Sequence, residues 1–197
     1  MRSAPFGLAA SREEAFRWAR DAGVLTHGHP SGYLSGAYFA AVIFDIARGA
    51  PLADAMRLAD ELLAKERGHE EMRAIVAEVR RLVAAGPPTA EAIEKLGGGW
   101  VGEEALGIGL LCARTAGGAT PHDVAAAVWR WVAHGGDSDS TGSITGNLLG
   151  AMHGVDALPS RWLAQLEMRD VIERCARDLF AGTVLGAQLD FEAYPPN

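Results

Sequence analysis

One acidic turn holds the residue types best suited to chemistry in this 197-residue sequence. Asp137 and Asp139 stand two residues apart, and Ser140 follows them directly. Hard divalent cations such as Mg²⁺ take carboxylate, hydroxyl and water oxygens, and these three side chains can point at one place. Asp and Ser are also favoured residues at the first turn of a helix, where they cap backbone N–H groups. The spacing alone leaves a metal site and plain helix capping both open.

The helix expected after this turn is unusually rich in glycine. Gly142, Gly146 and Gly150 recur at every fourth residue. Each interior glycine costs about 0.8–1 kcal/mol relative to alanine, so another interaction must offset the loss. Because a spacing of four places them on one face, we expect a second backbone or a ligand to approach that face closely. This pattern favours a metal or ligand site over capping alone, and we expect Asn147 nearby to form a helix–helix hydrogen bond.

The elements that must position this turn are predicted to be helices almost throughout, because apolar residues recur at helical intervals and strand-like alternation is missing. Capping signals support this all-α fold class, such as Ser11 with Glu14 and Thr120-Pro121 with Asp123. We expect helices over 11–23, 33–47, 52–68, 72–86, 89–96, 103–113, 121–134, 140–153 and 167–180. With no long linker or repeat, residues 1–186 are predicted to form one helical domain and residues 187–197 a surface tail.

The composition excludes several classes of function. Hydrophobic residues make up 49% of the chain, and the formal net charge is −7 without a basic block, so a general grip on nucleic-acid backbone is not expected. The two cysteines, Cys112 and Cys175, lack zinc-type spacing and are predicted to be small buried hydrophobes. No leader and no apolar run of about 18–20 residues is found, so the sequence predicts a cytoplasmic protein away from membranes.

The acidic turn and its glycine-rich helix resemble the metal motif of the ADP-ribosylglycohydrolases, a family that includes the dinitrogenase reductase-activating glycohydrolase. Further segments match the same family in the same order and extend the resemblance over positions 1 to about 165. They are Met1-Arg2-Ser3-Ala4-Pro5-Phe6-Gly7-Leu8, Leu25-Thr26-His27-Gly28-His29-Pro30, Gly98-Gly99-Trp100-Val101 with Glu103-Glu104-Ala105-Leu106, and Met152-His153-Gly154. The ordered set is far more specific than any single motif.

The resemblance implies an all-α bundle around two magnesium ions, or manganese in their place. It implies hydrolysis of the N- or O-glycosidic bond that joins ADP-ribose to a protein or small-molecule target. By the same matching, Asp137, Asp139 and Ser140 are metal ligands, with Ser140 where the family usually has threonine. His27 would lie at the ADP-ribose pocket, although a histidine capping a loop carbonyl is an equal alternative. His29 is expected to be structural.

Two further motif segments are expected to be structural. Trp100 is interpreted as a core residue rather than a stacking platform. The pair Glu103-Glu104 is interpreted as exposed glutamates on a helix. No catalytic residue is assigned.

The sequence also departs from the family pattern. Family members carry, before the segment that matches Met1 to Leu8, a half with a Ser/Thr-Asp-Asp metal triplet, a catalytic glutamate and a glycine-rich phosphate loop. Three hypotheses follow for the chain as given. The first is a hydrolase whose start lies further upstream, or whose N-terminal half is supplied by a separate chain or by a homo-oligomer. The second is a non-catalytic module that binds ADP-ribose or a nucleotide, and the third is a structural remnant of the family. Half a ligand set would hold Mg²⁺ weakly, because the ion demands near-octahedral geometry.

Overall fold

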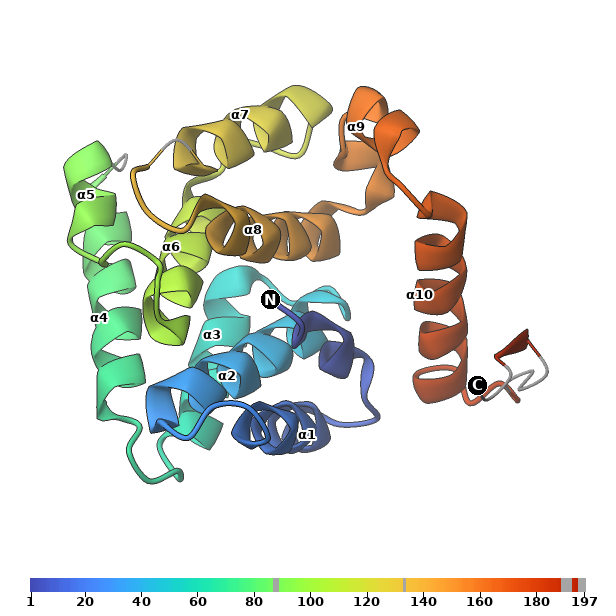
Figure 1. The fold of residues 1–197 in the computed structure, drawn as a ribbon, viewed down its shortest axis with the longest axis horizontal. Coiled ribbons are helices and arrows are strands. Elements are labelled where there is room, and N and C mark those ends of the chain that lie inside the picture. Colours follow the sequence, from blue (N-terminus) through green and yellow to red (C-terminus); the bar gives the residue numbers. More distant parts are fainter. Residues whose placement is uncertain (87–88, 133, 189–192, 195–197) are drawn as a thin grey trace.

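The computed structural model describes residues 1–86, 89–132, 134–188 and 193–194, and over these residues it contains helices and no strand (Figure 1). This confirms the all-α fold class. In chain order the elements are η1 (Ala4–Leu8), α1 (Arg12–Val24), α2 (Pro30–Ile46), α3 (Leu52–Leu63), α4 (Glu70–Ala85), α5 (Ala90–Glu94), α6 (Gly102–Thr115), α7 (Pro121–Val132), α8 (Ser138–His153), η2 (Val155–Ala157), α9 (Ser160–Gln165) and α10 (Arg169–Thr183).

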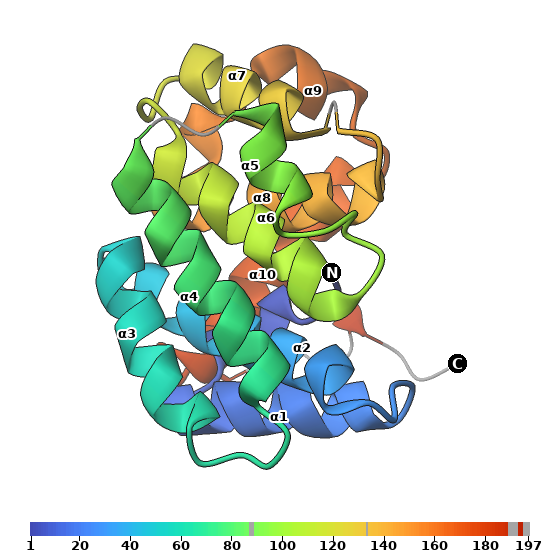
Figure 2. The same ribbon diagram turned by 90° about the vertical axis from the view of Figure 1, so that its left-hand side faces the viewer.

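Two apolar helices form the centre of the core. Residues 37–43 of α2 and 105–113 of α6 are buried without interruption. A helix that is apolar on every side must be covered on every side. Helices α1 and α3 pack on α2, while α4 and α8 pack on α6, as the two ribbon views show (Figures 1 and 2). The central place expected for 103–113 is therefore observed.

Glycines let the helices around α6 approach closely, but they are not the glycines that the sequence pointed to. A Cβ on Gly109 would lie 2.5 Å from Ile144 Cγ2 of α8, and one on Gly107 would collide with Ile75 of α4. On α8, a Cβ on Gly146 or Gly150 would have no atom within 4 Å. At these two positions no other backbone of the described residues approaches the glycine face of α8, so the expected close approach of a second helix is not observed, while approach by a ligand stays a prediction.

Local capping signals place several helix starts correctly. Ser11 Oγ accepts the Glu14 N–H at 3.1 Å at the start of α1. Thr120 Oγ1 accepts the Asp123 N–H, while Asp123 Oδ2 accepts the Thr120 N–H, both at 3.2 Å. These pairs satisfy N–H groups that have no partner inside the helix. The capping predictions for α1 and α7 are confirmed.

Other local expectations need correction. Helix α9 was not expected, and α8 begins two residues before Ser140. Cys112 is buried as predicted, but Cys175 is exposed because it lies on α10, none of whose residues is buried. Asn147 Nδ2 donates to Ser143 O at 2.8 Å within α8, and among the described residues its expected hydrogen bond to another helix is not observed. The expected tail falls partly on residues 189–192 and 195–197, outside the described residues.

The chain's first residues are held beside α2 by η1. Arg48 donates to Ala9 O at 2.9 Å and to Gly7 O at 3.3 Å, and its guanidinium lies 3.6 Å from the centre of the Phe44 ring. Gly7 packs so tightly that a Cβ would lie 2.5 Å from Ile43 Cγ2. These contacts bring Met1, Arg2 and Ser3 toward α8.

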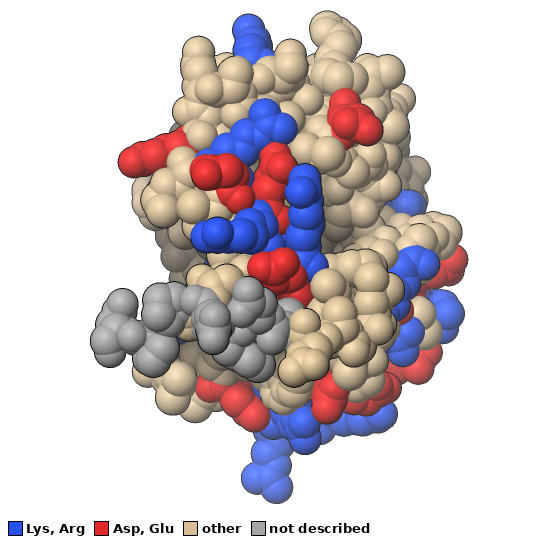
Figure 3. Space-filling model, turned by 90° about the vertical axis from the view of Figure 1, so that its right-hand side faces the viewer, with Lys and Arg blue, Asp and Glu red and all other residues tan. Residues whose placement is uncertain are grey.

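Helix α10 stands apart from the main body and has its largest contact with η1 (Figure 1). Its surface carries ion pairs in which Glu173 accepts from Arg169 at 2.6 Å and from Arg177 at 3.1 Å. Charges of both signs gather on the side of the molecule where this helix lies (Figure 3). Over the described part of the chain, no helix combines the length and apolar character needed to cross a membrane.

Candidate active site

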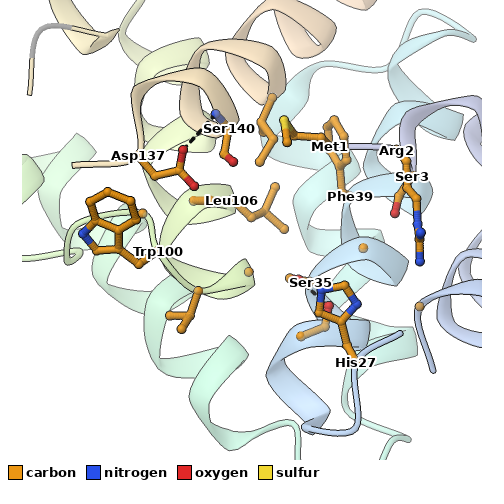
Figure 4. Close-up of a pocket in the computed structure, with 18 residues that line it drawn as sticks. Met1, Arg2, Ser3, His27, Ser35, Phe39, Trp100, Leu106, Asp137 and Ser140 are labelled. Carbon is orange, nitrogen blue, oxygen red and sulfur yellow. Dashed lines mark hydrogen bonds between the residues drawn. The ribbon is translucent and has the colours of Figure 1, made fainter. Parts of the chain in front are cut away.

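A pocket of about 330 Å³ lies where the start of α8 faces the start of the chain and two loops. Asp137 and Ser140 line it from α8, and Arg2 and His27 line it from the first segment and from the loop before α2. Figure 4 shows Asp137 and Ser140 at one end of this space and Arg2 and His27 at the other. Residues more than 100 positions apart in the sequence therefore share one cavity.

Asp137 is the N-terminal cap of α8. Its Oδ1 accepts the Ser140 N–H at 3.3 Å, and Asp139 Oδ1 accepts the same N–H at 2.7 Å. The capping alternative raised by the sequence is thus realised. Capping occupies one oxygen of each carboxylate, so it does not exclude a second role for the other oxygens.

The two carboxylates of this turn interact with each other. The pKa of Asp137 is lowered, first by a hydrogen bond with the Asp139 side chain and then by the Ser140 side chain. Asp137 lines the pocket, whereas Asp139 is exposed and lies outside its lining.

The donor atoms of this turn suit a magnesium ion in kind. Mg²⁺ is commonly held by one or two carboxylates with water completing its shell. Over the described residues, no group of three or more His, Cys, Asp or Glu side chains gathers as a ligand set. A cation here would therefore rest on Asp137, Asp139 and the Ser140 hydroxyl, with the remaining positions open to water or substrate.

The loop before α6 forms the next wall of the pocket. Gly99 has φ +76°, a conformation that side chains rarely adopt, and its N–H donates to Glu104 Oε2 at 3.0 Å. Trp100 beside it is 72% exposed and lines the pocket, so its expected place in the core is wrong. Glu103 and Glu104 are half-buried rather than exposed, and Glu104 fastens this loop to α6.

Arg2 and His27 lie together at the far end of the pocket. The Arg2 guanidinium donates to the Thr26 hydroxyl and, at 3.2 Å, to Ala22 O. His27 Nδ1 is 2.8 Å from Thr26 Oγ1, so the Thr26 hydroxyl contacts both Arg2 and His27. The alternative role expected for His27 from the sequence was to cap a loop carbonyl. In the structure, the ring nitrogen of His27 contacts the Thr26 side chain instead. His29 Nδ1 lies 3.0 Å from Ser31 Oγ, as a structural role requires.

Most residues that line this pocket were not predicted as site residues, and Arg2, Trp100 and Ser35 are among them. Arg2 and Trp100 belonged to recognised motifs, but nothing local indicated that they face a cavity. Ser35 lines the pocket from α2, where Gly32 and Gly36 let His27 and Ser3 approach the helix closely. The signal that was present is the run of small residues at Ser31, Gly32, Ser35 and Gly36, which share one helix face.

Comparison with known proteins assigns the class. A model of the ADP-ribosylglycohydrolase family matches residues 1–188, and this chain belongs to that family. The curated ADP-ribosyl-(dinitrogen reductase) glycohydrolase of Rhodospirillum rubrum is 53% identical to the chain over 38 residues. That match covers 19% of this chain and 13% of the relative.

Proposed function

We propose that the pocket binds the ADP-ribosyl group of a modified target and that the chain contributes to hydrolysis of its glycosidic bond. The observation that carries this proposal is the meeting of Asp137 and Ser140 with Arg2, His27 and Trp100 in one cavity. The family supports a hydrolase of ADP-ribosyl groups. The name of the curated relative refers to an ADP-ribosylated protein, which motivates a protein-linked substrate.

The lining offers each part of ADP-ribose a matching group. The Arg2 guanidinium can pair with diphosphate oxygens, because its planar donor fork fits phosphate geometry. The exposed Trp100 indole presents a flat face on which an adenine ring can stack. At the other end, the Ser140 hydroxyl can donate a hydrogen bond to a ribose hydroxyl or accept one from it, and the Asp137 carboxylate can accept one.

A divalent cation is part of the proposal. Asp137, Asp139 and Ser140 would hold it, and bound Mg²⁺ supplies orientation of ribose hydroxyls and a lowered pKa of bound water. The chain's own residues position the sugar and exclude water on the side of the apolar residues Phe39 and Leu106. Of the described residues that line the pocket, Asp137 alone has a carboxylate, so we assign no general acid.

The decisive experiment measures release of free ADP-ribose from an ADP-ribosylated arginine substrate with and without Mg²⁺. The chain is compared with Asp137→Asn and with Asp156→Asn, a matched change at an exposed position outside the pocket. We expect release that needs Mg²⁺, is lost in Asp137→Asn and persists in Asp156→Asn. Equal release by both variants would contradict the site.

The single lining carboxylate favours one alternative, a module that binds ADP-ribose without turnover. Calorimetric titration with ADP-ribose separates this alternative from the hydrolase. Binding without release would assign the chain to recognition alone. If the chain shows neither binding of ADP-ribose nor its release, both proposals are overturned, and the structural remnant of the family is the remaining hypothesis.

A further inference from the structure

His134 lies beside the acidic turn, and both nitrogens of its ring form hydrogen bonds to that turn and to α8, although His134 has no part in the proposed function. Its Nδ1 accepts the Gly136 N–H at 3.0 Å, and its Nε2 lies 3.0 Å from Thr141 Oγ1. The imidazole thus spans the turn from the residue before Asp137 to the first buried turn of α8. It is half-buried and does not line the pocket.

The hydrogen bonds determine where the proton of this imidazole resides. A ring nitrogen that accepts from a backbone N–H carries no proton, so Nδ1 is bare and the neutral ring has its proton on Nε2. Nε2–H then donates to Thr141 Oγ1, and that hydroxyl donates to the Asp137 main-chain O at 3.0 Å. The donors run in one consistent direction, from His134 through Thr141 to Asp137.

The same turn is fastened from its other side. The Asp137 N–H donates to Gly98 O at 2.8 Å, and the Thr141 N–H donates to Asp137 O at 3.2 Å. Gly136 fits so closely that a Cβ there would collide with Gly98 O and lie 2.8 Å from His134 Cε1. With the main chain held at Gly136, Asp137 and Thr141, the Asp137 side chain has a fixed origin at the pocket.

We propose that His134 is a positioning residue: its neutral imidazole, with the proton on Nε2, holds the turn so that the Asp137 side chain faces the pocket. It touches neither the proposed cation nor the proposed substrate. The tautomer follows from the geometry alone. The consequence for cation binding rests on the proposed function.

The first test reads the tautomer in the full chain without added metal. Long-range ¹H–¹⁵N correlation spectra at about pH 8, where an ordinary imidazole is neutral, distinguish the two ring nitrogens of each histidine. The His134 signals are assigned by their loss in His134→Asn. We expect a single tautomer with the proton on Nε2, in contrast to tautomer averaging at the exposed His122. A proton on Nδ1, or averaging like that of His122, would overturn the proposal.

The second test measures Mg²⁺ affinity by calorimetry for three folded variants. His134→Leu removes both hydrogen bonds and should weaken affinity about 10- to 100-fold, as loss of a partner that orients a ligand does. His134→Asn should recover part of the loss, because Oδ1 can replace Nδ1 as the acceptor for Gly136. His122→Leu is the matched control and should leave affinity unchanged.

The outcomes of the two tests separate this proposal from the proposed function. Full Mg²⁺ affinity in a folded His134→Leu variant contradicts positioning. Equal losses in His134→Leu and His134→Asn contradict the role of the Gly136 hydrogen bond. If the unmodified chain binds no Mg²⁺, the cation of the proposed function is refuted, while the tautomer spectrum still decides whether His134 fixes the turn.

Discussion

At the scale of single residues, the pocket combines opposite charges and one exposed aromatic ring. Asp137 and Arg2 occupy its two ends, which suits a ligand with sugar hydroxyls at one end and phosphates at the other (Figure 4). The Trp100 side chain is 72% exposed and therefore contributes little to the stability of the fold, since the free energy of burial scales with the apolar area removed from water. Its exposed face is therefore better explained by a ligand than by packing.

The Trp100→Ala variant tests this explanation. Base–aromatic stacking contributes about 1–3 kcal/mol, so we expect the Kd for ADP-ribose to rise roughly 5- to 150-fold. Trp129→Ala is the control, because Trp129 is also exposed but lies outside the pocket lining. Calorimetric titration provides the measurement, and equal affinities of the two variants would remove Trp100 from the site.

At the scale of elements, α6 rather than α8 supplies the glycines that helix packing needs. Gly109 of α6 faces Ile144 of α8 at contact distance, while Gly146 and Gly150 of α8 face open space. A glycine in open space still carries the cost of backbone freedom in the unfolded chain. The two helices should consequently respond in opposite ways to the same substitution.

Glycine-to-alanine changes test this difference between α6 and α8. Gly146→Ala should raise the free energy of unfolding by about 0.8–1 kcal/mol, because alanine favours the helix and meets no neighbour. Gly109→Ala should lower it by about 1–3 kcal/mol, because the new methyl group overpacks the contact with Ile144. Urea denaturation followed by circular dichroism measures both. Destabilisation by Gly146→Ala would restore the close-approach interpretation of α8.

At the scale of the whole molecule, stability is distributed unevenly. The core is built on α2 and α6, whereas α10 has no buried residue and packs mainly on η1 (Figure 1). Elements with few buried apolar contacts open at a lower free energy than the core. The acidic turn, in contrast, is tied to α6 through Gly98 and through the loop that Glu104 fastens.

Hydrogen exchange followed by mass spectrometry should reveal this gradient. Amides of α10 are expected to exchange by local opening, at least about tenfold faster than amides of α2, which need nearly global unfolding. Helix α3 has one exposed face and one buried face, so its peptides serve as an internal reference. Equal protection of α10 and α2 would show that α10 is part of the cooperative core.

Cation binding should be visible in the stability of the whole chain. A ligand that binds only the folded state at 100 times its Kd stabilises it by about 2.7 kcal/mol. We expect Mg²⁺ to raise the Tm of the chain and to have no such effect on Asp137→Asn or Asp139→Asn. Asp156→Asn controls for the change in net charge. An unchanged Tm shift in Asp139→Asn would remove this exposed carboxylate from the ligand set.

Much of this description was available from the sequence alone. The apolar periodicity indicated the helices, and caps such as Ser11 with Glu14 fixed their starts, because these signals act within one or two turns of chain. The acidic turn and its position before a helix were equally local. The family resemblance, now supported by a match over residues 1–188, named the expected chemistry.

Only the tertiary structure decided which residues meet. Arg2 and Asp137 share a pocket because Arg48 binds η1 to α2 and α6 carries α8 beside them. The exposure of Trp100 and the open space around Gly146 also depend on neighbours distant in the sequence. Capping and periodicity are set by residues three or four positions apart, whereas cavities are set by packing between elements, which no local pattern records.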